Sequence, residues 1–213
     1  WDFAPVVAVA QDVRWGRTYE SYGEETKLVT ALGTAYLKGL QTLTDEDTPS
    51  FGQSIFVLGT PKHFIGDGAT IWGSSQTDNY KLDQGNMQVP EEIVRKLYLP
   101  PYQSAVDAGA MNVMASFSSW KGTKMHAQQY WLTKVLKDEL GFDGFIVSDW
   151  EAINQIYPDD YYASVVTSIN AGVDMNMVPY DYVTFIQTMT NAVSNGDIPE
   201  SRVDEAVRRI LRV

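Results

Sequence analysis

Short apolar runs alternate with longer amphipathic stretches along this chain of 213 residues. The alternation constrains the fold more than any other feature, because it is typical of βα units that build a largely parallel sheet. A strand of such a sheet is covered on both faces and therefore carries a continuous apolar run. Five runs of this kind are predicted as strands, at residues 5–10, 55–59, 111–116, 145–148 and 172–177.

Apolar residues at helical spacing predict the connecting helices. The predicted helices cover residues 24–40, 91–108 and 127–140, and a last one begins within residues 198–203. Because proline disturbs a helix interior, Pro100 and Pro101 must bend or break the second of them. Residues 42–53 and 66–88 lack the pattern and are predicted to be a polar insertion and a long loop.

The number of units leaves two architectures open. A closed (β/α)8 barrel needs eight strands and typically about 250 residues. Five strands are predicted here, so the α/β fold is either an open doubly wound sheet or an incomplete (β/α)8 barrel of about five βα units. In the second case the first strands of the barrel precede Trp1.

Composition makes several partners unlikely choices for this chain. With 27 acidic and 16 basic residues the net charge is -11, which repels the phosphates of nucleic acids. No apolar run approaches the roughly 18 residues of a membrane span, and none is expected. Cysteine is absent, so disulfides and thiolate metal sites are excluded while the compartment stays open.

Polar residues that directly follow predicted strands are the first functional candidates, since α/β proteins keep their chemistry at this edge of the sheet. Asp149 ends the fourth strand, and Lys62 and His63 follow the second. If both strands share a sheet, a carboxylate, an ammonium and an imidazole converge there. A helix N-cap is an equally good explanation for Asp149. Trp150 is either the wall of a pocket or part of the core.

A second candidate group follows the first predicted strand. Arg17 offers a planar fork of donors suited to hydroxyls or carboxylates, and Glu20 is spaced to hold it. The alternative is an ordinary exposed ion pair. The only histidines, His63 and His126, do not have the spacing of a zinc motif, and no glycine-rich phosphate motif occurs. We therefore predict neither a metal nor a cofactor.

Five motifs occur in a fixed order and span nearly the whole chain. They are Arg14-Trp-Gly-Arg17-Thr-Tyr-Glu20, Lys62-His63-Phe-Ile-Gly-Asp67-Gly, Val113-Met-Ala-Ser-Phe117-Ser-Ser-Trp120, Phe142-Asp-Gly-Phe-Ile-Val-Ser-Asp149-Trp150 and Ala171-Gly-Val-Asp-Met-Asn-Met177. Together these motifs resemble glycoside hydrolase family 3, and the likeness is greatest to its exo-β-glucanase and β-glucosidase branch.

This resemblance implies a (β/α)8 barrel enzyme that acts on a β-glucoside or β-glucan. Asp149 would be the nucleophile of a retaining hydrolysis, which forms and then cleaves a glycosyl-enzyme ester. By the same matching, donors to the hydroxyls of the terminal sugar would be Arg17, Lys62 and His63. Phe117 and Trp150 would be walls of the sugar pocket. An extracellular or periplasmic location is also suspected from the resemblance alone.

The second carboxylate of a retaining enzyme is not identified in the chain. The resemblance implies that it comes from a separate C-terminal domain beyond Val213. Glu20, Asp67 and Glu151 are carboxylates of the chain, but none matches an acid/base motif of the family. Residues 1–213 are therefore expected to be a partial barrel domain that is inactive, or nearly so, by itself.

Two departures from the family pattern support other functions. Phe117 stands where relatives often carry tyrosine, and Gln76 stands where plant relatives carry glutamate. They are the basis for a non-catalytic carbohydrate-binding relative as the alternative function. A β-xylosidase or another β-glycosidase of the family is a further one, whereas the loop after Lys62 and His63 lacks the histidine of the hexosaminidase branch. If the motifs were coincidental, an unrelated five-stranded sensor-like domain would remain.

Overall fold

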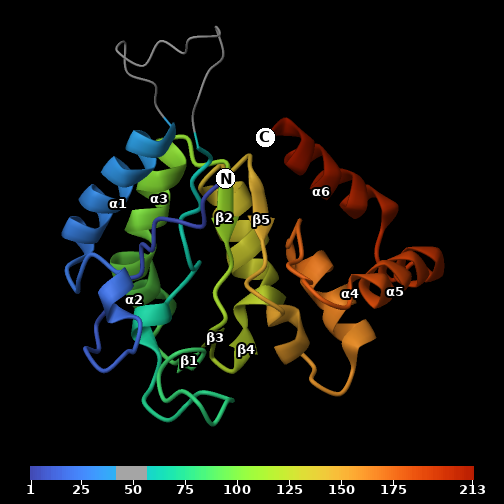
Figure 1. Cartoon of the computed structure of the whole chain (residues 1–213), viewed down its shortest axis with the longest axis horizontal. Helices are drawn as coiled ribbons and strands as arrows, with labels where there is room; N and C mark the ends of the chain where they lie inside the picture. The colour runs from blue at the N-terminus through green and yellow to red at the C-terminus, as the bar shows by residue number, and fades with distance from the viewer. Residues whose placement is uncertain (42–56) are drawn as a thin grey trace, which may run out of the picture.

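Parallel β-structure lies at the centre of the molecule (Figure 1). The computed structural model describes residues 1–41 and 57–213. Strands β2 (Asn112–Met114) and β5 (Phe145–Val147) pair in parallel. The third and fourth predicted strands are thereby confirmed, and both are buried along their whole length, as a continuous apolar run requires.

Single parallel bridges extend this pair on both sides. They join Val6 to Lys62, Phe64 to Ala115, and Val147 to Met175. The first and fifth predicted strands are thus present as extended segments with isolated bridges, not as regular strands. Within the part of the chain that the structure describes, the segments form an open series, and no bridge joins the last of them to the first. Over residues 1–41 and 57–213 the fold is mixed α/β without a closed barrel.

The predicted boundary of the second strand is wrong. Its first residues lie outside the described residues, but the bridges at Lys62 and Phe64 show that the extended segment continues well past Gly59. Thr60 and His63 are polar yet buried within it. Polar residues inside a buried segment look like its end in a sequence, which explains the error. The Lys62-His63 pair therefore lies within the extended segment.

The main core contains an apolar side chain from each of the five central segments. These are Val7, Phe64, Val113, Ile146 and Val173, and all are at most 1% exposed. Burying a side chain of this size stabilises the fold by roughly 1.5–3 kcal/mol. The helix over residues 130–139 alone contributes Trp131, Leu132, Val135 and Leu136. The core therefore fixes the central segments against the helical layer beside them.

Helices α1 (Thr26–Gln41) and α3 (Pro100–Asp107) pack together on one side of the central segments (Figure 1). The predicted helix 91–108 is broken as expected, because α2 (Glu91–Ile93) and the π-helical turn η3 (Val94–Tyr98) end before Pro100. The predicted helix 127–140 is present as the π-helix η5 (Tyr130–Glu139).

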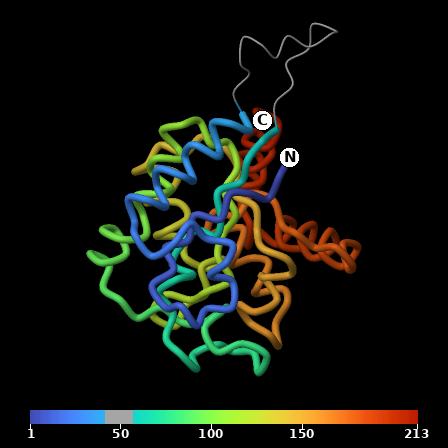
Figure 2. Tube along the Cα trace, turned by 60° about the vertical axis from the view of Figure 1, so that its left-hand side comes forward, coloured from blue at the N-terminus to red at the C-terminus, as the bar shows by residue number. Residues whose placement is uncertain are grey.

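Three helices cover the other side (Figure 1), and Figure 2 shows the second of them projecting at the edge of the molecule. They are α4 (Tyr161–Ala171), α5 (Tyr182–Asn195) and the predicted last helix α6 (Glu200–Arg212). Buried charges tie α6 to the sheet. Asp174 Oδ1 accepts from Lys137 Nζ at 2.8 Å and from Arg202 Nη2 at 2.7 Å, while its other oxygen accepts the Ile146 amide.

The predicted long loop 66–88 is ordered and closes on itself. Thr70 donates its hydroxyl to the Leu82 carbonyl at 2.7 Å, and the Gly73 amide donates to Lys81 at 2.8 Å. A Cβ at Gly68 would lie 1.9 Å from the Val9 carbonyl oxygen, so the close approach to the first segment requires glycine. Three short strands form a second sheet in the order β1-β3-β4, namely β1 (Asn86–Met87), β3 (Ser119–Trp120) and β4 (Thr123–Lys124). The remaining short elements are the 3-10 helices η1 (Thr18–Glu20), η2 (Asp67–Ala69), η4 (Met125–Ala127) and η6 (Ala152–Gln155).

Candidate active site

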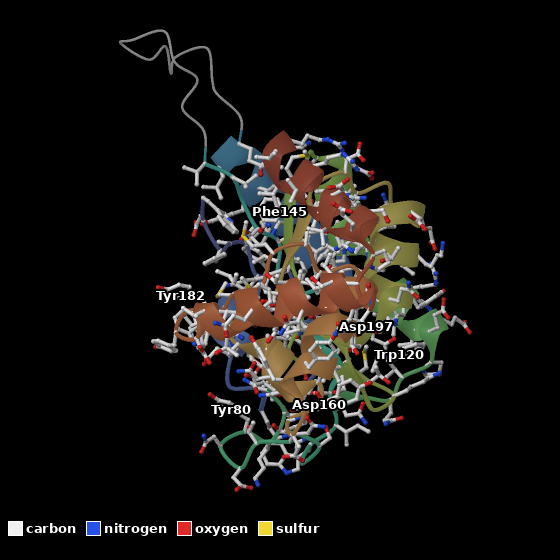
Figure 3. The ribbon with its side chains drawn as sticks, turned by 90° about the vertical axis from the view of Figure 1, so that its right-hand side faces the viewer. Tyr80, Trp120, Phe145, Asp160, Tyr182 and Asp197 are labelled. Atoms are coloured by element: carbon white, nitrogen blue, oxygen red, sulfur yellow. The ribbon has the colours of Figure 1, made fainter. Side chains whose placement is uncertain are left out.

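A cavity of about 750 Å³ opens beyond the carboxyl end of β5. Tyr80, one of its lining residues, lies well below Phe145, the first residue of β5, in the view of Figure 3. The cavity is lined by Arg14, Gly16, Arg17, Tyr19, Glu20, Trp72, Asn79, Tyr80, Lys81, Leu82, Asp83, Gln84, Phe117, Asp149 and Trp150. Four of the six predicted site residues are among them, and Lys62 and His63 are not.

Asp149 lies just beyond the carboxyl end of β5, where two hydrogen bonds hold it. Its amide donates to Nε2 of His126 at 3.0 Å, and its Oδ1 accepts the Trp150 amide at 2.7 Å. Burial and the Lys124 charge lower the pKa of His126 to about 3. The imidazole is therefore neutral near pH 7, and Nε2 is free to accept. The next helix, η6, has Glu151 at its N-cap position, so the helix-cap role for Asp149 is wrong.

His63 connects Asp149 to a buried carboxylate. Its Nε2 lies 3.5 Å from Asp149 Oδ2, and its Nδ1 lies 2.7 Å from Asp67 Oδ2. Burial alone would raise the pKa of Asp67, but His63, the Ser116 hydroxyl and Arg17 outweigh burial and lower that pKa. Asp67 is thus a carboxylate that orients the imidazole. His63 lies just beneath the cavity, which explains its absence from the lining.

Arg17 is fixed by the carboxylate that the sequence indicates. Its Nε and Nη2 donate to the two oxygens of Glu20, each at 2.8 Å, and Nη2 also lies 3.3 Å from His63 Nε2. Burial opposes the charged form of Arg17, but Glu20, Asp67 and Asp83 raise its pKa above the ordinary value. The structure therefore places a permanent, oriented cation beside His63 and on the wall of the cavity.

Lys62 is half-buried and belongs to the same electrostatic cluster. Burial and the charge of Arg17 lower its pKa, while the carboxylates of Glu20 and Asp149 oppose that shift. The Lys62 ammonium therefore interacts electrostatically with Asp149 but does not line the cavity. The convergence of Asp149, Lys62 and His63 that the strand ends predict is present, although Lys62 is the least direct of the three.

Two aromatic side chains of the predicted set lie at the cavity. Trp150 is 49% exposed and meets the ring of Tyr180 edge-on, with centroids 5.8 Å apart. This exposure rules out the core-packing explanation for Trp150. Phe117 is half-buried, and its ring packs edge-on near that of His126 at a centroid distance of 6.2 Å.

Several site residues were missed by sequence reasoning. Asp83 lines the cavity, and its Oδ1 accepts from the buried Trp15 indole at 2.9 Å. Burial, with the charge of Asp67, raises the pKa of Asp83. The available signal was the position of the polar loop 66–88 directly after the Lys-His pair. Nothing local to Asp83 distinguishes it from the other polar residues of that loop.

Lys124 joins three segments around the cavity. Its Nζ donates to the Phe117 carbonyl at 3.0 Å and to Gln155 Oε1 at 2.7 Å, and lies 3.5 Å from the Gln84 carbonyl. The Gln155 amide in turn donates to Gln84 Oε1 at 2.9 Å. Burial lowers the pKa of Lys124 to about 8. We call these three residues, Lys124, Gln155 and Gln84, the lysine clamp.

Among residues 1–41 and 57–213, no group of three or more histidine, aspartate or glutamate side chains is arranged to hold a metal ion. No helix of the described chain is long and apolar enough to cross a membrane.

Known proteins resemble this chain in sequence and in overall fold. The glycosyl hydrolase family 3 N-terminal domain matches residues 1–213. The chain belongs to glycoside hydrolase family 3. This family 3 chain superimposes on the exo-1,3/1,4-β-glucanase ExoP from a Pseudoalteromonas species with a TM-score of 0.86 and 41% identity, covering all of this chain and 25% of that one.

Two curated relatives show the breadth of the family. The lysosomal β-glucosidase of Dictyostelium discoideum is 32% identical over 220 residues, which cover all of this chain and 26% of that protein. A β-xylosidase of Formosa agariphila is 33% identical over 212 residues, or 95% of this chain and 28% of that protein. The family 3 chain thus spans about a quarter of the length of the relatives it matches.

Proposed function

We propose that the protein containing this chain is a retaining glycoside hydrolase that releases terminal β-linked glucose from β-glucans or β-glucosides. The observation that carries the proposal is Asp149, a carboxylate at the end of β5 that lines the cavity together with the oriented guanidinium of Arg17. Family membership and the named activities of the relatives support the same reaction class.

Asp149 acts as the nucleophile in this proposal. A carboxylate oxygen attacks the anomeric carbon, the bond to the leaving oxygen breaks, and a glycosyl-enzyme ester forms. Water then attacks the same carbon and releases the sugar. Each displacement inverts the anomeric centre, so the two together retain its configuration. Arg17 and His63 hold hydroxyls of the sugar, with Lys62 as a nearby third cation, and Phe117 and Trp150 contact its apolar faces.

The acid/base carboxylate comes from outside this chain in the proposal. A retaining enzyme needs a second carboxyl group about 5 to 5.5 Å from the nucleophile. Both oxygens of Glu20 are bound by Arg17, and Asp67 is buried beneath His63. Neither is free to protonate a leaving group. Residues 1–213 as a partial barrel domain would therefore show little turnover, and a C-terminal domain would complete the site.

The stereochemistry of the product tests the reaction class. The complete natural polypeptide is incubated with methyl β-glucoside or a β-linked glucose disaccharide, and the first sugar released is observed by proton NMR. β-Glucose as the first product, followed by slow mutarotation, supports double displacement. α-Glucose as the first product means inversion and contradicts the nucleophile role of Asp149.

Two other functions have specific support. The likeness to a β-xylosidase makes terminal xylose the competing sugar, and comparison of matched β-glucoside and β-xyloside substrates decides between them. Phe117 in the cavity wall lacks a hydroxyl, which favours a non-catalytic carbohydrate-binding protein. Calorimetric binding of glucose by the complete polypeptide without any hydrolysis would establish that alternative.

A further inference from the structure

The backbone amide of Asp149 lies outside the ladder of hydrogen bonds between β2 and β5. In that ladder the Phe145 amide donates to the Met111 carbonyl at 3.1 Å. The same register, continued to Asp149, would bring its amide to the carbonyl of Ala115. The amide donates instead to Nε2 of His126 at 3.0 Å. A side chain thus takes the place of the neighbouring strand at the residue that lines the cavity.

A different set of contacts holds the carbonyl of Asp149. Its oxygen accepts from the Ser148 hydroxyl at 3.0 Å and from the Ala152 amide at 3.2 Å. The Ser148 hydroxyl oxygen also accepts the Met177 amide at 2.7 Å, which connects it to the fifth central segment. His126 therefore restrains the amide of Asp149, while these contacts restrain its carbonyl.

His126 is itself held in place. Its side chain is fully buried, and it lies on η4 next to Met125, a member of the main core. The Met125 amide donates to the Ser118 carbonyl at 2.9 Å, which anchors the start of η4. The acceptor nitrogen is thus in position before any substrate arrives. Groups that are ordered beforehand do not have to be ordered during the reaction.

Packing does not account for a histidine at this position. Because Nε2 of His126 accepts a hydrogen bond, the proton of the neutral ring is on Nδ1. That nitrogen is buried and has no hydrogen-bond partner in the part of the chain that the structure describes. A buried donor without a partner costs free energy, which an apolar side chain of similar size would avoid. The contact that the ring gains in return is the one to the Asp149 amide.

We propose that His126 is a positioning residue, which fixes the carboxylate of Asp149 for attack by holding its backbone amide. This inference rests on the proposed function, in which Asp149 is the nucleophile. A shift of the Asp149 backbone moves the carboxylate with it and alters the 2.7 Å contact between Oδ1 and the Trp150 amide. A displacement of about 1 Å at a reacting group can slow a reaction about a hundredfold.

The first displacement tests this role separately from acid/base catalysis. The substrate 2,4-dinitrophenyl 2-deoxy-2-fluoro-β-glucoside has a leaving group that departs without protonation, and its release is followed by absorbance. In the complete natural polypeptide, His126→Phe keeps an aromatic ring but removes the acceptor. We expect the rate constant for glycosyl-enzyme formation to fall about tenfold to a hundredfold. The substrate concentration that gives the half-maximal rate should stay within about threefold, because binding is not affected.

His126→Gln is the conservative variant, since its amide oxygen can accept in place of Nε2, and it should recover most of the loss. Leu37→Ala is the control for lost stability. Leu37 is fully buried in α1 and lies outside the cavity lining, so its truncation weakens the core and should leave both kinetic parameters unchanged. No loss in His126→Phe, an equal loss in His126→Gln, or the same loss in Leu37→Ala would overturn the proposal.

Hydrogen exchange makes the test independent of turnover. Mass spectrometry of overlapping peptides should show faster exchange of the Asp149 amide in His126→Phe and wild-type exchange in His126→Gln. Unchanged exchange in His126→Phe would refute the proposal. If His126→Phe does not fold, the wild type decides, because its Asp149 amide should exchange as slowly as the Val147 amide within β5, and exchange at the rate of an exposed loop amide would refute the contact. Absence of any glycosyl-enzyme in the wild type would refute the proposed function, while exchange would still decide whether His126 holds this amide.

Discussion

His126 should make the protein sensitive to acid. Its pKa is lowered from 6.5 to about 3 by burial and by Lys124, so the folded state keeps it neutral where the unfolded chain is protonated. Between those two values the unfolded state binds one more proton than the folded state. Stability therefore rises with pH in this window and is lost as pH falls from about 6.5 toward 3.

The expected size of the effect follows from the linkage. Each unit of pH inside the window is worth about 1.36 kcal/mol. From pH 7 to pH 5, His126 alone should thus remove about 2 kcal/mol from the free energy of unfolding. Protonation of His126 also affects the site directly, because the neutral Nε2 of His126 accepts the backbone amide of Asp149.

A glutamine at position 126 isolates this contribution. His126→Gln offers an amide oxygen as acceptor for the Asp149 amide but does not titrate. Urea unfolding of the complete polypeptide, followed by tryptophan fluorescence at pH 7 and pH 5, gives the loss of stability for each protein. We expect the wild type to lose about 2 kcal/mol more than the variant over this interval. Equal losses in both would refute the assignment of a buried neutral histidine.

Three further changes are expected from named contacts. Glu20→Gln removes the charge that orients Arg17, so calorimetry on the complete polypeptide should show glucose binding about tenfold weaker, in line with ~1.5–3 kcal/mol for hydrogen bonds to charged groups. The pKa of Lys124 is about 8, so the lysine clamp loses its charge as pH rises through that value, and kcat/KM should fall. Lys124→Met should abolish this fall of kcat/KM at high pH. Asp174→Ala leaves Lys137 buried without its closest partner and should lower the free energy of unfolding by about 3–5 kcal/mol in urea titrations. Unaltered glucose affinity in Glu20→Gln would contradict the first prediction, and an unaltered pH profile of kcat/KM in Lys124→Met the second. An unaltered unfolding midpoint in Asp174→Ala would contradict the third.

The sequence predicts the central segments well because their burial is continuous. β2 and β5 are apolar at almost every position, and a fully buried strand permits nothing else. The extent of the second segment is different, because Thr60 and His63 are buried beside distant residues, Trp1 and Arg17, and no local pattern shows these contacts.

Two helices were missed for a related reason. Helices α4 and α5 contain many β-branched residues and few strong helix formers. Each begins at an aspartate, Asp160 or Asp181, whose side chain accepts the amide three residues later. Those N-caps were readable in the sequence, but the apolar pattern that follows them is too mixed to select a helix.

Some residues of the candidate site are predicted by the sequence and others are not. Asp149, Arg17 and His63 follow from strand ends and motifs, and the structure brings them together. Asp83 and Lys124 acquire their environment from partners far along the chain, such as Trp15, which is 68 residues from Asp83. Such pairings depend on how loops dock after folding, so neither residue type nor spacing indicates them.

The proposal that Asp149 is the nucleophile is tested most directly by trapping its ester. A 2-deoxy-2-fluoro-β-glucoside with a good leaving group slows the second displacement, so the glycosyl-enzyme accumulates. Mass spectrometry of the complete polypeptide should then show one added fluoroglucosyl group, located by peptide mapping on Asp149 and missing in Asp149→Asn. A label on another residue, or an undiminished label in the variant, would contradict the proposal.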